Sequence, residues 1–254
     1  MSDVKQFWEG RAGDPSLDAS QVTHPDIWQQ WLEIETIKTL VSPRDRVIDI
    51  GCGAGYTTKQ IAPLVAEILG LDYSAGMIKR AQTDQQGVPP NTRFEVADVL
   101  SLSSDQFGVF DIALTVRCLI NLPDWATQQY ALRNIARLVR PGGLYIFIEG
   151  RRDGRAALNR AREALGLEKM PTVWYNLDFD REETLGFLDE FYRLEREIGF
   201  GTYDAIARVV HPLLVAPNAP EYMAKINEIA ARLALHRPND LENSRVAVFC
   251  LRRR

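Results

Sequence analysis

The sequence contains little of what stabilises small extracellular domains or binds metals, since its 254 residues include 3 cysteines and 3 histidines. Cys52, Cys118 and Cys250 are odd in number and far apart, and no C-x-x-C pair or histidine at ligand spacing accompanies them. This pattern argues against a disulfide framework and against a zinc site. We therefore expect no bound metal, and a reducing cytoplasm suits the chain.

Long apolar runs and an excess of positive charge are also missing. No stretch approaches the length of a membrane span, and the N-terminal residues lack the continuous apolar segment of a signal peptide. The net charge of −4 and the pI near 5.5 argue against a general nucleic-acid-binding protein. We expect no membrane or nucleic-acid partner, and either a monomer or a homodimer.

One cluster of positive charge stands out against this background. Five arginines lie between residues 151 and 162 on one predicted helix, and no aromatic residues alternate with them. We interpret the cluster as a solvated helix face. Arg151 is a possible exception, because it follows a strand end that faces the expected site.

Predicted strands and helices alternate along the first 150 residues, which predicts a parallel sheet with right-handed crossovers. Residues 3–23 are polar and are expected to form a mobile arm rather than part of the core. From Pro25, apolar residues recur at helical spacing until Ser42 and Pro43 end the helix. We place strands at residues 46–50, 67–72, 93–97, 110–116, 144–149, 191–198 and 245–252.

The segment from Val47 to Thr58 is a buried strand that runs into a glycine turn and opens a helix. Gly51, Gly53 and Gly55 stand at alternate positions, which lets the backbone adopt positive φ and bring N–H groups close to a ligand. The dinucleotide pattern G-x-G-x-x-G needs its third glycine one residue later, where Tyr56 stands. The turn therefore disfavours a nicotinamide oxidoreductase.

Carboxylates end the next two predicted strands. Asp72 ends the second strand, 23 residues after Asp49, where a ribose diol needs an acceptor. Asp98 follows the third strand and precedes the apolar Val99. A helix closing on Leu-Val-Arg-Pro-Gly-Gly at residues 138–143 leads into the fifth strand.

These motifs resemble, from Arg46 to Glu149, the class I S-adenosylmethionine-dependent methyltransferases. The resemblance implies one domain over residues 1–254, with a three-layer, doubly wound Rossmann-like sheet of seven mostly parallel strands and an antiparallel last strand. Residues 1–41 would form an N-terminal arm and helix. Residues 150–180 and 200–243 exceed the minimal fold, and such long inserts are usually lids or binding loops.

The resemblance also implies a site for S-adenosylmethionine. Asp49 would orient the turn, Asp72 would bind the ribose, and Asp98 would accept from the adenine amino group. Arg117 begins the segment after the fourth strand, which usually closes over the cofactor. The predicted cofactor site comprises Asp49, Gly51, Gly53, Gly55, Asp72, Tyr73, Met77, Asp98, Val99 and Arg117.

Transfer to a hydroxyl acceptor requires a base, and histidine is best poised for proton transfer near neutral pH. His211 lies in an apolar, proline-bounded stretch and is the leading candidate, with a structural histidine as the open alternative. His24 precedes Pro25 and could cap the helix, and the carboxylate of Glu149 is another possible base.

The acceptor is expected to be a small molecule. The motif N/D-P-P-Y/F does not follow the fourth strand, which disfavours N-methylation of adenine or glutamine. The second insert looks similar to methyltransferases of sugar-modifying gene sets, which favours a hydroxyl of a sugar or related metabolite. Trp174, Tyr175, Asn176 and Tyr203 would suit a polyol. The alternative is a non-catalytic S-adenosylmethionine sensor or partner subunit.

Overall fold

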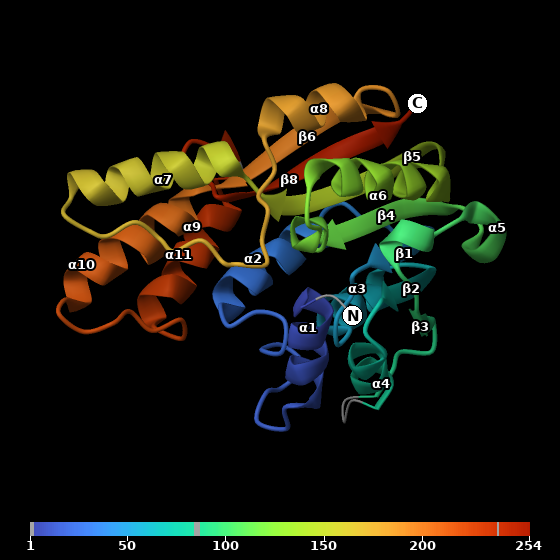
Figure 1. The fold of residues 1–254 in the computed structure, drawn as a ribbon, viewed down its shortest axis with the longest axis horizontal. Helices are drawn as coiled ribbons and strands as arrows, with labels where there is room; N and C mark the ends of the chain where they lie inside the picture. Colours follow the sequence, from blue (N-terminus) through green and yellow to red (C-terminus); the bar gives the residue numbers. More distant parts are fainter. Residues whose placement is uncertain (1–2, 84–86, 238) are drawn as a thin grey trace.

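The structure, a computed structural model, describes residues 3–83, 87–237 and 239–254. Its described residues form one sheet of eight strands in the order β3-β2-β1-β4-β5-β8-β6-β7. Figure 1 shows this sheet crossing the middle of the molecule with helices on both sides. The strands are β1 (Arg46–Ile50), β2 (Glu67–Asp72), β3 (Thr92–Val96), β4 (Phe110–Val116), β5 (Val139–Gly150), β6 (Tyr192–Phe200), β7 (Asn239–Asp240) and β8 (Val246–Arg253).

The strand directions confirm the predicted fold class. Strands β1 to β5 pair in parallel, and β8 lies antiparallel between β5 and β6. The two-residue strand β7, which was not predicted, extends the sheet beyond β6. Strand β5 starts at Val139 rather than at residue 144, because Val139 already pairs with Phe110 before a bulge.

Two apolar layers pack against the sheet. Alternate strand residues on one face contact α2 (Ile27–Lys38), α3 (Tyr56–Ile61) and helices of the second insert. Residues on the other face pack against α6 (Trp125–Leu138) and α8 (Arg181–Leu188). The edge at β3 is covered by α4 (Ala75–Thr83). Shorter elements are η1 (Ala62–Leu64), η2 (Val99–Ser101), α5 (Ser104–Phe107) and η3 (Leu119–Asn121).

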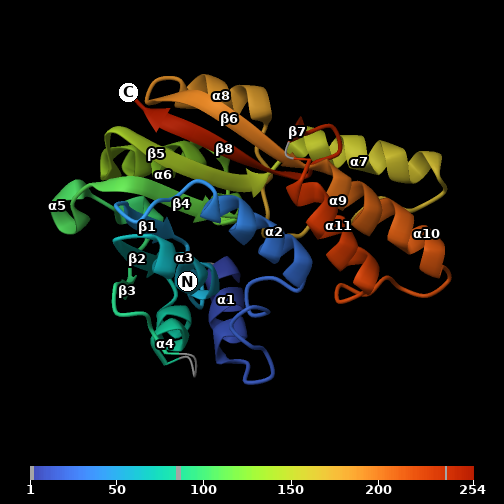
Figure 2. The same cartoon turned by 180° about the vertical axis from the view of Figure 1, so that it is seen from behind.

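The two inserts together form a helical lobe beside the carboxyl ends of β4 and β5 (Figures 1 and 2). The first insert supplies α7 (Arg152–Ala164) and the loop that follows it, and the second supplies the remaining helices. These are α9 (Gly201–Ala205), the π-helical turn η4 (Ile206–Val210), α10 (His211–Val215) and α11 (Lys225–Leu235). No helix among the described residues is both long and apolar enough to cross a bilayer.

The N-terminal segment, expected to be a mobile arm, contains the helix α1 (Asp3–Gly13). None of the residues of α1 is buried, but Val22 further along the segment is fully buried against Ala54 and Met77, so the prediction that residues 3–23 lie outside the core is wrong for Val22. Glu9 accepts a hydrogen bond from the backbone N–H of Gly76 at 3.2 Å, and Arg80 donates to the carbonyl of Ala12 at 3.2 Å. Both bonds hold α1 against α4.

Candidate active site

The loop between β1 and α3 has the backbone that its glycines predict. Gly51, Gly53 and Gly55 have φ values of 77°, 54° and 77°. A Cβ on Gly51 would lie 2.3 Å from the Cys118 sulfur, and a Cβ on Gly53 would lie 2.5 Å from the Thr23 methyl. Only glycine therefore fits the loop, both in conformation and in space.

The three glycines do not share one role. Gly51 and Gly53 line a large cavity, whereas Gly55 is not among the lining residues. Gly55 precedes α3, and a Cβ there would lie 2.6 Å from the ring of Phe94 on β3. Its position allows close packing behind the loop.

Asp49 and Asp72 support the loop from the ends of β1 and β2. Asp49 accepts from the Thr58 hydroxyl at 2.6 Å, and burial raises its pKa to about 7. Asp72 accepts from the backbone N–H groups of Gly53 and Ser74, each at 2.9 Å. Burial raises the pKa of Asp72 to about 6, although these two bonds favour the ionised form. Both carboxylates line the cavity.

The remaining predicted cofactor residues continue the cavity wall along β2 and β3. Tyr73, Met77, Asp98 and Val99 all line it. Asp98 accepts from the backbone N–H of Leu100 at 2.9 Å and so caps η2. The site that a nucleoside would need is thus assembled from the carboxyl ends of neighbouring strands.

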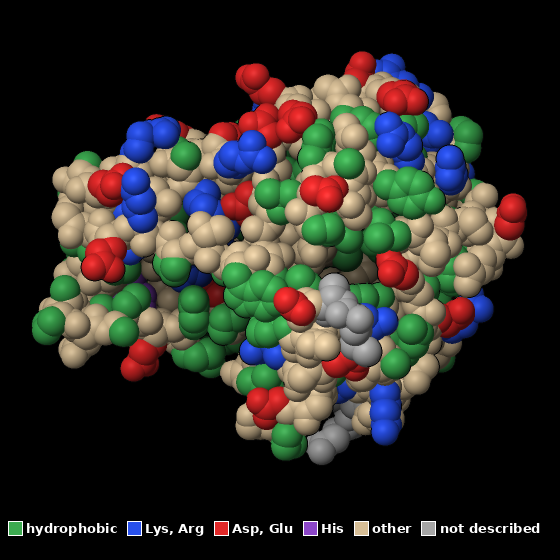
Figure 3. All heavy atoms as spheres, viewed as in Figure 1, with side chains coloured by type: hydrophobic (Ala, Val, Ile, Leu, Met, Phe, Trp, Pro, Cys, Tyr) green, Lys and Arg blue, Asp and Glu red, His purple; other side chains and the backbone are tan. Residues whose placement is uncertain are grey.

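Helix α1 and the loop after α7 meet above this site. Phe7 and Tyr175 have ring centroids 4.7 Å apart, and Trp8 and Tyr175 lie 5.4 Å apart. Trp8 also donates to the side-chain oxygen of Asn121 at 3.0 Å. Figure 3 shows hydrophobic side chains gathered between the lobe and the body of the molecule. The Trp174 side chain, which packs against Phe7 and Tyr175, is 63 % exposed. The aromatic cluster of Phe7, Trp8, Trp174 and Tyr175 covers the cavity.

The cavity has a volume of about 1420 Å³ and extends from the glycine loop to the lobe. At the lobe end it is lined by arginines that sequence reasoning assigned to solvent or did not consider, including Arg155, Arg162 and Arg208. The interpretation as a solvated helix face is therefore wrong for Arg155 and Arg162. Arg151 is buried against Asp153 and Glu197 and is not among the lining residues.

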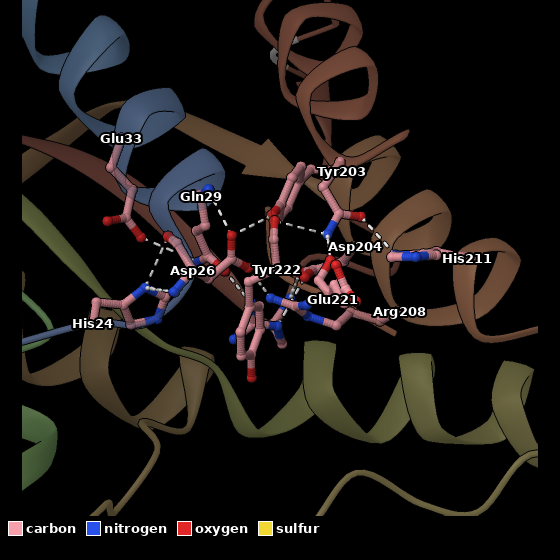
Figure 4. A network of polar contacts seen from close by, with 12 residues as sticks. His24, Asp26, Gln29, Glu33, Tyr203, Asp204, Arg208, His211, Glu221 and Tyr222 are labelled. Carbon is pink, nitrogen blue, oxygen red and sulfur yellow. Dashed lines mark hydrogen bonds and ion pairs between the residues drawn. The ribbon is translucent and has the colours of Figure 1, made fainter. Parts of the chain in front are cut away.

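A buried polar network joins the lobe to the start of α2 (Figure 4). Asp26 caps α2 and accepts from the Tyr203 hydroxyl at 2.5 Å. Burial favours the neutral form of Asp26, but its ion pair with Arg208, the nearby His24 and the hydrogen bonds from Tyr203 and Gln29 together keep the pKa of Asp26 below its usual value. The lobe is therefore fastened to the cavity wall by buried charges.

A second branch of the network runs along α2. The amide of Gln29 donates to Glu33 at 3.1 Å and accepts from Arg245, and Arg245 pairs with Asp204 at 2.8 Å. Burial raises the pKa of Glu33, and its ion pair with Arg117 at 3.0 Å opposes the rise. These groups give the cavity a polar wall on the side of the lobe.

The structure does not bring His211 to the cavity. His211 is 3 % exposed, and its Nδ1 lies 3.1 Å from the side-chain oxygen of Asn227 on α11. Figure 4 shows His211 pointing into the lobe, and it is not among the lining residues. This placement favours the structural alternative, and the catalytic role of His211 stays a prediction without support from geometry.

His24 is instead the histidine that lines the cavity. Its Nδ1 lies 3.0 Å from the carbonyl oxygen of Asp26. Burial and the nearby charge of Arg117 hold the pKa of His24 well below 6.5, so the imidazole is neutral at pH 7. The sequence shows His24 just before an amphipathic helix, which predicts a helix cap. No local signal indicates that its side chain lines the cavity.

Glu149 organises the loop that follows β4. It is fully buried at the end of β5 and accepts from the backbone N–H groups of Cys118, Leu119 and Ile120 at 3.1, 2.9 and 3.3 Å. These residues border the glycine loop and the cavity. Glu149 is not among the lining residues, so it acts through the loop.

Comparison with known proteins agrees with this geometry. Residues 47–143 match the family described as Methyltransferase domain. A ubiquinone biosynthesis O-methyltransferase of Chelativorans sp. (strain BNC1) is 34% identical over 174 residues, covering 66% of this chain and 63% of that protein. A trans-aconitate 2-methyltransferase of Deinococcus radiodurans is 40% identical over 107 residues, covering 40% and 36%. The chain thus spans less than two thirds of the length of these curated relatives.

The fold extends the likeness to the whole chain. The crystal structure of the N-methyltransferase NodS from Bradyrhizobium japonicum WM9, in complex with S-adenosyl-L-homocysteine, superimposes with a TM-score of 0.58. It is 15% identical, and the superposition covers 99% of this chain and 98% of NodS. The glycine loop, the acids at the strand ends and the order of the strands agree with this fold, and residues 47–143 of the chain are similar to the methyltransferase domain.

Proposed function

We propose that this protein transfers the methyl group of S-adenosylmethionine to an oxygen atom of a small-molecule acceptor. The observation that carries the proposal is the continuity of the cavity from the glycine loop to the lobe. One end has the backbone and carboxylates that suit a nucleoside, and the other has arginines and aromatic residues. Two ligands can therefore meet within one enclosed space.

The cofactor end fits S-adenosylmethionine on structural grounds. Gly51 and Gly53 line the cavity with bare backbone, and no larger residue fits there because a Cβ would clash with Cys118 or Thr23. Asp72 uses one lone pair of each oxygen on backbone N–H groups, which leaves acceptor capacity for the ribose hydroxyls. Asp98 lies further along the same wall, towards the expected adenine position.

Methyl transfer from a sulfonium is an in-line displacement on a donor that is already activated. The protein must align the two reactants and exclude water. The lobe would hold the acceptor, and α1 with the aromatic cluster would cover the reacting groups. The loop held by Glu149 would shape the floor between donor and acceptor.

A hydroxyl acceptor also loses a proton, and we propose His24 rather than His211 as the base. The His24 imidazole is neutral and faces the cavity, with one ring nitrogen next to the backbone of Asp26. Nδ1 lies 3.0 Å from the Asp26 carbonyl oxygen and 3.2 Å from the Asp26 backbone nitrogen; in the tautomer in which Nδ1 donates to the carbonyl, Nε2 carries the lone pair that takes the proton. His24→Gln should then lower turnover strongly, whereas His211→Gln should retain it if the protein stays folded.

A sugar hydroxyl, favoured by the sequence, stays within this proposal, but the expected polyol platform is incomplete. Tyr203 is fully buried, donates to Asp26 and is not among the cavity-lining residues. Tyr175 and Asn176 do line the cavity. Oxygen as the acceptor atom is supported by the name of the ubiquinone biosynthesis O-methyltransferase relative.

The test is an acceptor screen with S-adenosylmethionine carrying a labelled methyl group. Sugars and sugar nucleotides, phenols, and hydroxy acids would be compared by label transfer and by acceptor-dependent release of S-adenosylhomocysteine. Asp72→Ala serves as the inactive control. Binding of S-adenosylmethionine without turnover of any acceptor would instead support a sensor or partner subunit, and a preference for NAD would contradict the proposal.

A further inference from the structure

Arg117 has an unusual backbone for its residue type. It is the non-glycine residue with positive φ among the described residues, at 52°, directly after β4. Non-glycine residues in this region are strained, and such strain is concentrated at active sites and ligand clamps. The backbone N–H of Arg117 donates to the carbonyl of Ile148 at 2.7 Å, and Asn121 donates to the Arg117 carbonyl at 3.0 Å. The strained conformation is therefore held from both sides.

The guanidinium of Arg117 is only partly used. Its Nη2 lies 3.0 Å from Glu33, while Nε and Nη1 are buried and have no hydrogen-bond partner among the described residues. Buried donors of a charged group almost always find an acceptor, because leaving them unpaired is costly. Arg117 lines the cavity, so a bound ligand can supply that acceptor.

The side chain of Arg117 points away from the glycine loop and towards α2. Its neighbour Cys118 occupies the space beside Gly51, whereas the Arg117 side chain reaches Glu33 on α2. Burial raises the pKa of Tyr175, and the charges of Arg11 and Arg117 oppose that rise. Arg117 thus lies close to the insert loop that carries Tyr175.

The same insert loop holds a complementary group. The side-chain oxygen of Asn176 is buried in the cavity region and has no hydrogen-bond partner within the described chain. An amide oxygen accepts hydrogen bonds, so it suits a hydroxyl rather than a carboxylate. Arg117 therefore contributes unpaired donors and Asn176 an unpaired acceptor, and both residues line the same cavity.

Three other cavity arginines are neutralised by carboxylates, whereas Arg162 donates to the backbone carbonyl oxygens of Glu168 and Arg208. Arg208 pairs with Asp26, and Arg155 pairs with Asp178. Arg245 pairs with Asp204 in the same way. Arg117 also has an acidic partner in Glu33, but it differs from these arginines because two of its nitrogens stay unpaired.

We propose that Arg117 binds a carboxylate of the acceptor and that Asn176 accepts a hydrogen bond from its hydroxyl, so that the acceptor is a small hydroxy acid. This inference rests on the proposed function, because it assigns the substrate class of the same site. It also assigns Arg117 to the acceptor, whereas the sequence placed it with the cofactor.

The experiment is calorimetric titration of the whole protein with three kinds of probe. S-Adenosylhomocysteine tests the full cofactor site, and 5′-methylthioadenosine tests the same site without the amino-acid carboxylate. Malate and citrate are titrated into protein saturated with S-adenosylhomocysteine, with glycerol as the uncharged control. The variants are Arg117→Gln and the double variant Arg117→Gln/Glu33→Gln, which leaves no unpaired buried carboxylate. Arg160→Gln, on an exposed arginine of α7 that does not line the cavity, is the matched control.

We expect Arg117→Gln to weaken malate or citrate binding by roughly tenfold or more, the loss typical of one charged hydrogen bond. Binding of S-adenosylhomocysteine should stay within about threefold of wild type. If the single variant does not fold, the same comparison is made with the double variant. Arg160→Gln should bind all the probes as wild type does.

Three results would overturn the inference. The wild-type complex could bind neither hydroxy acid, or Arg160→Gln could weaken them as much as Arg117→Gln does. Alternatively, Arg117→Gln could lose S-adenosylhomocysteine but keep 5′-methylthioadenosine, which would assign Arg117 to the methionine carboxylate. Failure of S-adenosylhomocysteine to bind wild-type protein would be different, since it would refute the proposed function itself.

Discussion

The carboxylate of Asp72 can be removed in two independent ways, by mutation and by protonation. It stands at the end of β2, bonded to the backbone N–H groups of Gly53 and Ser74. We expect its remaining lone pairs to accept hydrogen bonds from the ribose hydroxyls of the cofactor. Asp72→Ala and acid should therefore weaken S-adenosylhomocysteine binding for the same reason.

The magnitude follows from the bonds lost. Two hydrogen bonds to a charged acceptor contribute about 1.5–3 kcal/mol each, and water can replace part of them in the variant. A net loss of about 3 kcal/mol corresponds to an affinity on the order of a hundredfold weaker. Asp72→Ala also leaves two N–H groups without their acceptor, which should lower the free energy of unfolding by about 1–3 kcal/mol each.

The effect of pH has a definite sign. Burial raises the pKa of Asp72 to about 6, and the ionised carboxylate is the form that accepts from the ribose. Affinity should therefore be constant above about pH 7 and fall about tenfold by pH 5, with one unit of pKa equivalent to 1.36 kcal/mol. The Asp72→Ala variant should bind weakly at every pH.

The assay is calorimetric titration with S-adenosylhomocysteine between pH 5 and 8, with thermal unfolding of each sample as a check on folding. The reasoning would be refuted by wild-type affinity that does not change over this range. Binding by folded Asp72→Ala within about threefold of wild type would refute it equally.

Three further predictions concern stability and are measured by thermal or denaturant unfolding. Asp49→Asn keeps an acceptor for Thr58 and removes a carboxyl whose pKa burial raises to about 7. Because wild type loses stability as the pH rises from about 4 to 7, the variant should be more stable than wild type by about 2–4 kcal/mol at pH 8 but not at pH 4. Equal stability of variant and wild type at both pH values would contradict this. Gly53→Ala should be strongly destabilising, because the added Cβ would lie 2.5 Å from the Thr23 methyl group. Adding Thr23→Ser to this variant removes that methyl, so the remaining loss of stability should be the cost of the positive φ, about 1–2 kcal/mol. A double variant no more stable than Gly53→Ala would contradict the packing. Glu149→Gln places an amide N–H where a backbone N–H of the loop after β4 needs an acceptor. The free energy of unfolding should therefore fall by about 1–3 kcal/mol, and methyl transfer should be slower. A variant with unchanged stability and activity would disprove the role of Glu149 in this loop.

The elements of the sheet were predictable because their signals are local. Strand β1 and the glycine loop, Asp72 at the end of β2 and Asp98 after β3 all appear in sequence order, and parallel strands bring their carboxyl ends to one edge. Most of the cofactor end therefore followed from the sequence. Helix α1 was missed because its contacts with α4 stabilise it more than its own polar sequence does.

The acceptor end was much less predictable. His211 had the stronger sequence signal, but its apolar surroundings were the inside of the lobe, where Asn227 satisfies it. Arg155 and Arg162 were predicted to face solvent, because no local pattern shows that α7 turns one face to the cavity. Arg208 meets Asp26 across 182 positions of the chain.

By itself the sequence determined the fold class and which residues gather at the glycine-loop end of the cavity, because periodicity, glycine turns and strand-end acids act within a few residues of each other. Only the tertiary structure decided which histidine faces the cavity, which arginines are neutralised, and that Arg117 keeps unpaired donors in a strained backbone. These properties depend on burial and on partners supplied by α2, the lobe and the loop after β4. No local pattern encodes them, because burial is set by how distant segments pack.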